Sequence, residues 1–120
     1  QVTRWSRNGT YEIVVAGTGT SGSDNQSLSS PMQTDLDANG TYIYIADWFN
    51  HRIQRWLVGA NEGNTIVGIS GSAGAGLNQL NQPAGVALDP NETYIYVADQ
   101  AKHRVQRFIL QSEHIFNRQE

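Results

Sequence analysis

The stretch TYIYIADWFNHRIQRW (residues 41–56) returns as TYIYVADQAKHRVQRF at residues 93–108, displaced by 93 − 41 = 52 positions. Agreement in register over a segment of this length indicates an internal repeat. A period near 50 residues is typical of architectures in which each unit buries its apolar faces only by stacking on its neighbours. The sequence therefore predicts a repeat protein.

The repeat extends beyond this block in both directions. Pro31 pairs with Pro83 at the same displacement of 52. Further back, residues 1–17 match residues 52–68 at a displacement of 51, so one residue has been gained or lost in the Gly/Ser-rich loop between them. Loops tolerate such changes at little cost, and the chain is predicted to hold two periods and the start of a third.

Short apolar runs within each period predict strands. In residues 41–47 and 93–99 tyrosines alternate with Ile or Val, which places apolar atoms on both faces of a strand. Turn residues punctuate the chain at short intervals, as in Asp37-Ala-Asn-Gly40. No window carries the apolar spacing of an amphipathic helix, so we expect four strands per period and little or no helix.

Sheets with two apolar faces fit the four-stranded antiparallel blades of a β-propeller. The segments YIYIADWFNHRIQRW and YIYVADQAKHRVQRF, each preceded by Pro-x-x-x-x-x-Asp, resemble the NHL repeat. Asn50-His51 matches the Asn-His of the family motif, whereas Lys102 replaces the Asn in the second copy. The resemblance covers nearly all of residues 1–110 and implies a ring of about six blades, roughly 300 residues long.

The predicted fold class is therefore all-β, a propeller segment of about two and a half NHL-type blades. The expected layout is the last two strands of a blade plus a loop, a full blade, a partial blade, and a degenerate strand or tail, at residues 1–30, 31–82, 83–110 and 111–120. An open stack of this kind exposes apolar faces, which drive association. The chain is then a piece of a longer repeat protein, one subunit of a homotrimer that closes a six-bladed ring, or a gene remnant, and repeat energetics favour the first.

Composition excludes several chemistries. The 120 residues include no Cys, so the chain has no disulfide, no thiolate metal site, no Cys nucleophile and no RING cysteines. A net charge of −3 with scattered Arg gives no broad basic field, which disfavours nucleic acid as a partner. No apolar run approaches the length of a membrane span. The chain begins with Gln and shows no leader sequence, so we expect a processed, cut or fragmentary N-terminus.

An Asp and a His recur four residues apart in both copies, each His being followed by an Arg. An Asp/His pair can ligate a metal or act as a general base. A residue needed once per protein should not return in every blade, so we expect an internal network of Asp, His and backbone hydrogen bonds that fixes the loop. The residues of this predicted network are Asp47, His51, Arg52, Asp99, His103 and Arg104. No catalytic residue, metal ligand or cofactor is predicted.

Differences between the copies locate side chains that the fold does not need. Trp48 and Phe49 stand where the second copy has Gln100 and Ala101. Aromatic side chains dominate binding hot spots, so this pair is a candidate partner contact. Packing against the neighbouring blade is the alternative.

Two other sets of residues recur in register and are assigned to structure. The aromatic residues at one repeat position are predicted to lie in the core between blades: Trp5, Trp56 and Phe108. The arginines that precede them are predicted to pair with Asp or Glu in a solvated or rim position: Arg4, Arg55 and Arg107.

Four Asn-x-Ser/Thr sequons occur, at Asn8, Asn25, Asn39 and Asn91, where about one or two are expected by chance. They favour an extracellular location and glycosylation of these residues. Asn39 and Asn91 also stand in turns, where Asn is favoured for its backbone tolerance, so a cytosolic location stays open.

The predicted function is a non-enzymatic scaffold that binds a protein or peptide partner at the Trp48-Phe49 end. The resemblance to NHL proteins implies three alternatives. These are the substrate-recognition part of a RING-type ubiquitin ligase, a fragment of a propeller enzyme of the amidating lyase or lactonase type with an axial metal, and an RNA-binding NHL domain.

Overall fold

The computed structural model describes residues 1–6, 8–9, 12–74, 76, 79–110 and 115–119. That part of the chain contains ten strands and two single-turn 3-10 segments. The strands are β1 (Val2–Trp5), β2 (Glu12–Ala16), β3 (Pro31–Leu36), β4 (Tyr42–Asp47), β5 (Arg52–Leu57), β6 (Gly63–Gly68), β7 (Pro83–Leu88), β8 (Tyr94–Asp99), β9 (Arg104–Leu110) and β10 (Ile115–Gln119). The 3-10 turns η1 (Trp48–Asn50) and η2 (Gln100–Lys102) connect β4 to β5 and β8 to β9.

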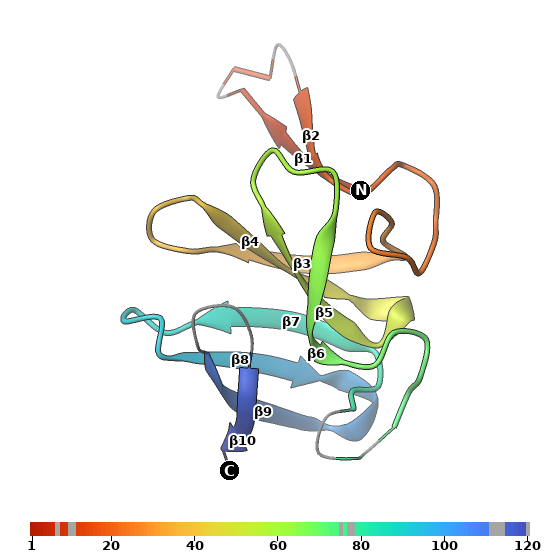
Figure 1. Ribbon diagram of the computed structural model, residues 1–120, viewed down its shortest axis with the longest axis vertical. Coiled ribbons are helices and arrows are strands. Elements are labelled where there is room, and N and C mark those ends of the chain that lie inside the picture. Colours follow the sequence, from red (N-terminus) through yellow and green to blue (C-terminus); the bar gives the residue numbers. More distant parts are fainter. Residues whose placement is uncertain (7, 10–11, 75, 77–78, 111–114, 120) are drawn as a thin grey trace.

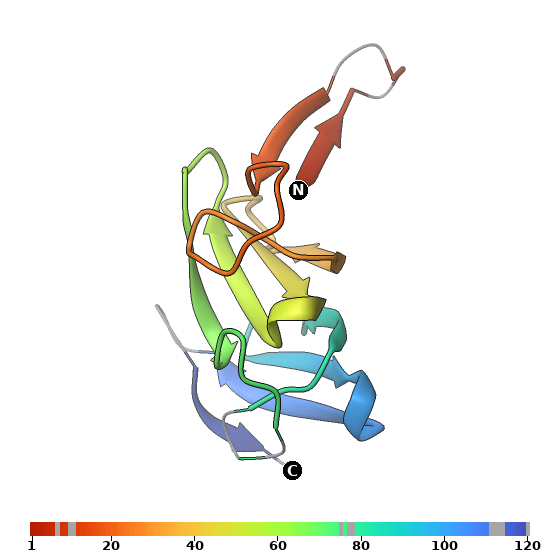
Figure 2. The same ribbon diagram turned by 90° about the vertical axis from the view of Figure 1, so that its right-hand side faces the viewer.

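The strands form three antiparallel sheets. Strands β3 to β6 make one four-stranded sheet and β7 to β10 a second, each with chain neighbours side by side, while β1 and β2 form a two-stranded sheet. Figures 1 and 2 show the two-stranded sheet at one end of the molecule, β3–β6 in the middle and β7–β10 at the other end. Four-stranded antiparallel sheets stacked in this way are propeller blades, which confirms the predicted fold class. We call β3–β6 blade A, β7–β10 blade B, and β1–β2 the half-sheet.

Blade B gains its fourth strand from the C-terminal segment. Residues 111–120 were expected to form a degenerate strand or a tail, and β10 lies within them and pairs with β9. Residues 111–114 and 120 lie outside the described part of the chain. The sheet that begins at residue 83 therefore extends beyond residue 110, where the sequence placed the end of a partial blade.

The tight turns between the first two strands of each blade explain why their Asp recurs. In blade A, Oδ1 of Asp37 accepts hydrogen bonds from the backbone N–H groups of Thr41 (2.7 Å) and Tyr42 (3.2 Å). Asp89 makes the same pair of bonds in blade B. A side-chain acceptor of this kind closes a turn by satisfying amides that have no strand partner.

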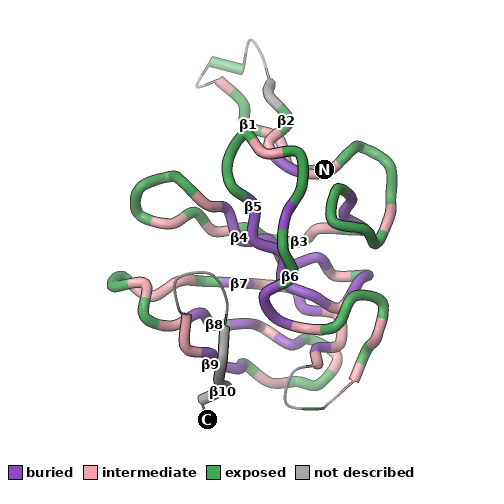
Figure 3. The backbone as a smooth tube through the Cα atoms, viewed as in Figure 1, coloured by how far each residue is buried: buried purple, intermediate pink, exposed green. Residues whose placement is uncertain are grey.

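Two apolar clusters join the sheets, and Figure 3 shows burial concentrated where blade A meets its neighbours. Blades A and B share the larger cluster, made of Tyr44, Ala46, Ile53, Ile66, Val67, Leu80, Val86, Ile95, Val97 and Phe108. The half-sheet packs on the opposite face of blade A through a smaller cluster of Ala16, Leu28, Ile43, Ile45 and Trp56, with Val2 and Val15 against it. Each residue of the smaller cluster stands one repeat before a residue of the larger one, so the half-sheet occupies the position of the blade before blade A.

The prediction of an inter-blade core is correct at two of the three aromatic positions. Trp56 and Phe108 are 1% and 4% exposed, whereas Trp5 is 57% exposed. The reason is that the described half-sheet has only the outer two strands of a blade. In blade A, Trp56 lies opposite Ile43 on the neighbouring inner strand, and the half-sheet supplies no such neighbour for Trp5.

The recurring arginines of the two blades, Arg55 and Arg107, each lie on a tyrosine ring, and the predicted solvated position is wrong for Arg55. The guanidinium of Arg55 lies 4.6 Å from the ring centroid of Tyr42, and that of Arg107 lies 4.3 Å from the ring of Tyr94. Arg55 is only 3% exposed. The tyrosines that alternate along the second strand supply aromatic faces directly across from the third strand, and a guanidinium stacks favourably on such a face.

Candidate binding surface

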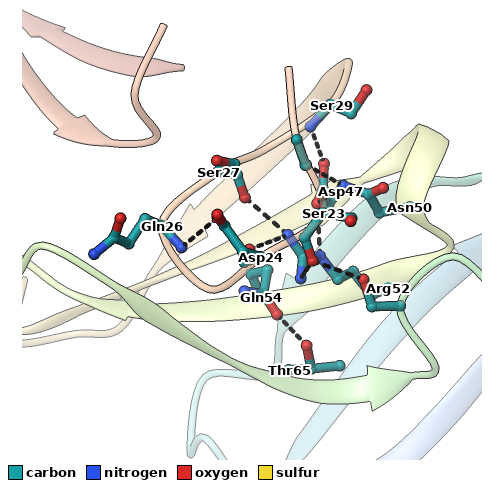
Figure 4. A network of polar contacts seen from close by, with 12 residues as sticks. Ser23, Asp24, Gln26, Ser27, Ser29, Asp47, Asn50, Arg52, Gln54 and Thr65 are labelled. Atoms are coloured by element: carbon teal, nitrogen blue, oxygen red, sulfur yellow. Dashed lines mark hydrogen bonds and ion pairs between the residues drawn. The ribbon is translucent and has the colours of Figure 1, made fainter. Parts of the chain in front are cut away.

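A buried ion pair fixes the loop that enters blade A. Asp47 and Arg52 are both almost fully buried, and Oδ2 of Asp47 accepts a hydrogen bond of 2.7 Å from Nε of Arg52. The same oxygen accepts a bond from Nδ2 of Asn50 (2.9 Å), and Oδ1 accepts one from the backbone N–H of Ser29 (2.7 Å). All four residues appear in Figure 4. The carboxylate is thus occupied by structural donors on both oxygens.

The guanidinium of Arg52 continues the network into the preceding loop. It donates to the backbone carbonyls of Ser23 (3.1 Å), Asp24 (3.0 Å) and Ser27 (2.8 Å). Hydrogen bonds from the Ser27 hydroxyl and from the backbone N–H of Gln26 lower the pKa of the Asp24 carboxyl in the same loop. One arginine therefore holds residues 23–27 of the crossing from the half-sheet to blade A against β5.

Blade B repeats this arrangement in a weaker form. Oδ2 of Asp99 accepts from Nε of Arg104 at 2.9 Å and from the side chain of Gln106, and Oδ1 accepts from the backbone N–H of Asn81. Arg104 is 29% exposed, against 1% for Arg52. Lys102 stands where Asn50 contributes its amide in blade A, and in blade B the side chain of Gln106 donates to the carboxylate instead.

The histidine of the predicted network bonds elsewhere. Nδ1 of His51 accepts a hydrogen bond of 3.0 Å from the backbone N–H of Gln82, in the loop that enters blade B. His51 has a left-handed φ of +57° at the end of η1, and His103 repeats this with +54°. The expected Asp–His contact is therefore replaced by an Asp–Arg pair, while His51 ties blade A to the entry of blade B.

Two clefts on the described part of the chain are candidate ligand sites. The larger, of about 380 Å³, lies between the half-sheet and blade A and is lined by Val14, Val15, Ala16, Gly17, Thr18, Gln26, Trp56, Ala60 and Asn61. The smaller, of about 200 Å³, contains Asp35, Asp89 and Glu92 among its lining residues. Each of these carboxylates accepts a backbone N–H bond, from Leu88, from Thr93 and Tyr94, and from Ala38 respectively. Among the described residues no group of three or more His, Asp or Glu is placed to hold a metal ion.

The Trp48-Phe49 pair lies on η1, at the end of β4. The two rings are stacked with their centroids 6.4 Å apart. Nε1 of Trp48 donates a hydrogen bond of 2.9 Å to Oε1 of Gln100 in blade B. Phe49 is 61% exposed and is held through its backbone N–H, which donates to the carbonyl of Ser29. Figure 1 shows η1 and η2 on the same side of the stacked blades, so the aromatic pair stands on a surface that both blades share.

The sequons all lie on the surface. Asn8, Asn25, Asn39 and Asn91 are exposed. Asn39 and Asn91 also lie in turns, as the alternative explanation for these two residues expects, so their exposure does not separate glycosylation from a role in the turn. Glycosylation stays a prediction.

Sequence reasoning missed two polar residues on the innermost strand of blade A. Oε1 of Gln33 accepts a hydrogen bond of 3.0 Å from the backbone N–H of Val86, and Oδ2 of Asp35 accepts one of 2.8 Å from the backbone N–H of Leu88. These side chains fasten β3 to the edge of β7. Their counterparts in the second copy are Gly85 and Ala87, so a comparison of the copies at the first strand would have found them.

The stacked four-stranded sheets with their repeated Asp–Arg loops define a β-propeller segment, and comparison with known proteins gives the repeat type. A family model of the NHL repeat matches residues 80–108. NHL repeat-containing protein 2 of Gallus gallus is 26% identical over 98 residues, which cover 74% of this chain and 13% of that protein. The Homo sapiens protein of the same name is 24% identical over shares of the same size. Residues 80–108 thus match the NHL repeat that the motifs indicated, and the chain spans about 13% of the length of these relatives.

A solved structure shows the same fold. A candidate 6-phosphogluconolactonase from Bacteroides uniformis aligns with a TM-score of 0.57 at 15% sequence identity, over 98% of this chain and 34% of that one. At that identity the likeness concerns the fold alone. In the described part of the chain no helix is long and apolar enough to cross a membrane.

Proposed function

We propose that this chain is a non-enzymatic NHL-repeat propeller segment that binds a protein or peptide partner through the surface around Trp48 and Phe49. The observation that carries the proposal is Phe49, a large aromatic residue that is 61% exposed. Ala101 occupies the same position in blade B, so the fold tolerates a small residue there. An exposed aromatic side chain beside a second aromatic ring is the kind of anchor that dominates interface energetics.

The position of Trp48 supports the same proposal. Its hydrogen bond to Gln100 and its stacking on Phe49 hold both rings in place before any partner arrives. A contact surface that is already ordered loses less side-chain entropy on binding than a mobile one. The alternative reading, packing on the neighbouring blade, applies to Trp48 and leaves Phe49 free to make the contact.

Support for a non-enzymatic role comes from the carboxylates. Asp47 and Asp99 are buried in ion pairs, and the carboxylates of the smaller cleft accept backbone hydrogen bonds. A general base needs a carboxylate that can take a proton from a substrate, and these oxygens are directed at structural donors.

The test uses site-specific photocrosslinking, because the partner is unidentified. Benzoylphenylalanine replaces Phe49 in one version of the chain and Leu57 in a control. Leu57 is 47% exposed and lies at the far end of β5, away from η1. We expect a discrete crosslinked protein from position 49 and none from position 57.

The identified partner is then titrated by calorimetry against the parent chain, Phe49→Ala and Leu57→Ala. The Phe49 variant should lose about 2 kcal/mol or more of binding free energy, as hot-spot residues do, while the Leu57 variant should bind like the parent. Equal affinity of all three chains would refute the proposed surface.

A further inference from the structure

The half-sheet is docked on blade A as the outer part of a blade, and its inner edge is open. In blade A, β5 pairs with β4 on its inner side and β6 on its outer side. Strand β1 is the repeat counterpart of β5, and in the described chain it pairs with β2 alone. The larger cluster contains Tyr44 and Ala46 from β4, and in the described chain the half-sheet contains no strand that corresponds to β4.

Two side chains on β1 lie exposed where their counterparts are covered. Trp5 is 57% exposed, against 1% for Trp56 and 4% for Phe108. Arg4 is also exposed, whereas Arg55 at the same position lies over the ring of Tyr42. Both differences would be removed by one further strand beside β1 whose Tyr lies diagonally across from Arg4, as Tyr42 lies diagonally across from Arg55.

The contact between β3 and β7 indicates which side chain of a preceding blade would contact β3. Asp35 on β3 accepts the backbone N–H of Leu88 on β7, one blade further along. The amide at the same repeat position on β3 belongs to Leu36, which is 52% exposed. A carboxylate on the innermost strand of the preceding blade would meet this amide as Asp35 meets Leu88.

On the first strand of the preceding blade, the position that corresponds to Gln33 requires a small residue. A Cβ built on Gly85 would lie 2.6 Å from Oε1 of Gln33, so the reach of Gln33 depends on glycine in the following blade. A second Gln one blade earlier would meet the Cβ of Gln33 in the same way. The occupant therefore has a small side chain at the position of Gln33 and an acidic one at the position of Asp35.

A second copy of the chain does not fit this place. Its inner hairpins are β3–β4 and β7–β8, and both β4 and β8 already pair on two sides. Neither has a free edge for β1. Blade B also has Ala87 at the position of Asp35, so it lacks the carboxylate.

We propose that the free edge of β1 and the inner edge of β3 together bind a two-stranded antiparallel hairpin, the inner half of an NHL-type blade. Its second strand pairs with β1, covers Trp5 and places a tyrosine ring on Arg4. Its first strand carries a carboxylate that accepts the backbone N–H of Leu36. This surface is separate from the Trp48-Phe49 surface, and either proposal can fail alone.

The experiment restores this hairpin in the register of the repeat. Residues 31–51 with Gln33→Gly are placed directly before Gln1, so that residue 51 precedes Gln1 as it precedes Arg52 in the chain. The matched control fusion differs only by Asp35→Ala in the added hairpin. Fluorotryptophan NMR follows Trp5, and amide hydrogen exchange follows Leu36 of the parent sequence.

In the fusion we expect the Trp5 resonance to move to a buried environment and the Leu36 amide to exchange about tenfold more slowly or better, since a hydrogen bond to a charged group contributes on that scale. The control fusion should keep the Trp5 shift and lose the Leu36 protection. An unchanged Trp5 resonance, equal Leu36 exchange in both fusions, or a fusion less stable than the parent chain overturns the proposal. So does burial of Trp5 in the parent chain by self-association, detected by sedimentation.

Discussion

The indole Nε1 of Trp48 donates a hydrogen bond of 2.9 Å to Oε1 of Gln100, and these two residues occupy the same repeat position in successive blades. The two copies of the repeat differ at this position, and the two differing residues form a hydrogen bond with each other. The aromatic residue in blade A needs a polar acceptor beside it, and blade B supplies one at the matching place.

This contact predicts coupling between the two positions. Trp48→Phe and Gln100→Ala should each lower the free energy of unfolding by about 0.5–1 kcal/mol, and the double variant should lose little more than either, because both changes remove the same hydrogen bond. Urea denaturation of the four chains measures the coupling. Fully additive losses would show that the bond contributes nothing in solution.

The tryptophans should differ sharply in their effect on stability. Trp56→Ala empties a position that is 1% exposed and should cost about 3–5 kcal/mol. Trp5→Ala changes a residue that is 57% exposed and should stay within about 0.5 kcal/mol of the parent. Thermal unfolding of both variants tests this, and similar losses would contradict the exposed placement of Trp5.

The two buried ion pairs give a second matched comparison. Asp47→Asn removes the charge that compensates an arginine of 1% exposure and should cost about 3–5 kcal/mol. Asp99→Asn should cost less, because Arg104 is 29% exposed and water can solvate its guanidinium. Chemical denaturation of the two variants gives the order, and a larger loss for Asp99→Asn would contradict the assignment.

Alkaline pH should destabilise the chain through Tyr44. Burial raises the pKa of this phenol above its ordinary value of 10.0, although a hydrogen bond with Arg55 opposes the rise. The unfolded state then ionises first, so the stabilisation is complete below pH 10.0 and is lost as the pH climbs through the folded pKa. Tyr44→Phe should therefore lose less stability above pH 10.0 than the parent. Identical pH dependence in denaturation curves of the two chains would exclude this role of Tyr44.

The sequence alone determined the blade architecture. The alternation of Tyr with Ile or Val between turn residues specifies strands with two apolar faces, and its return after 52 residues specifies sheets that stack on one another. Those properties are local and periodic, so they can be read without coordinates. The recurrence of Asp47 with Asp99 likewise marked a structural network. The sequence placed both His51 and Arg52 in it, and the structure shows that Arg52 bonds to Asp47 whereas His51 bonds to the backbone of Gln82.

Tertiary structure decided which surface each residue meets. Trp5 and Trp56 share a repeat position, yet one is exposed and the other buried, because burial depends on strands contributed by segments distant in the chain. The same holds for Gln33 and Asp35, whose acceptor oxygens satisfy amides of another blade. The repeat determines which type of residue stands at each position. Whether its apolar surface is buried and its hydrogen-bonding groups have partners depends on the neighbouring strands in the tertiary structure.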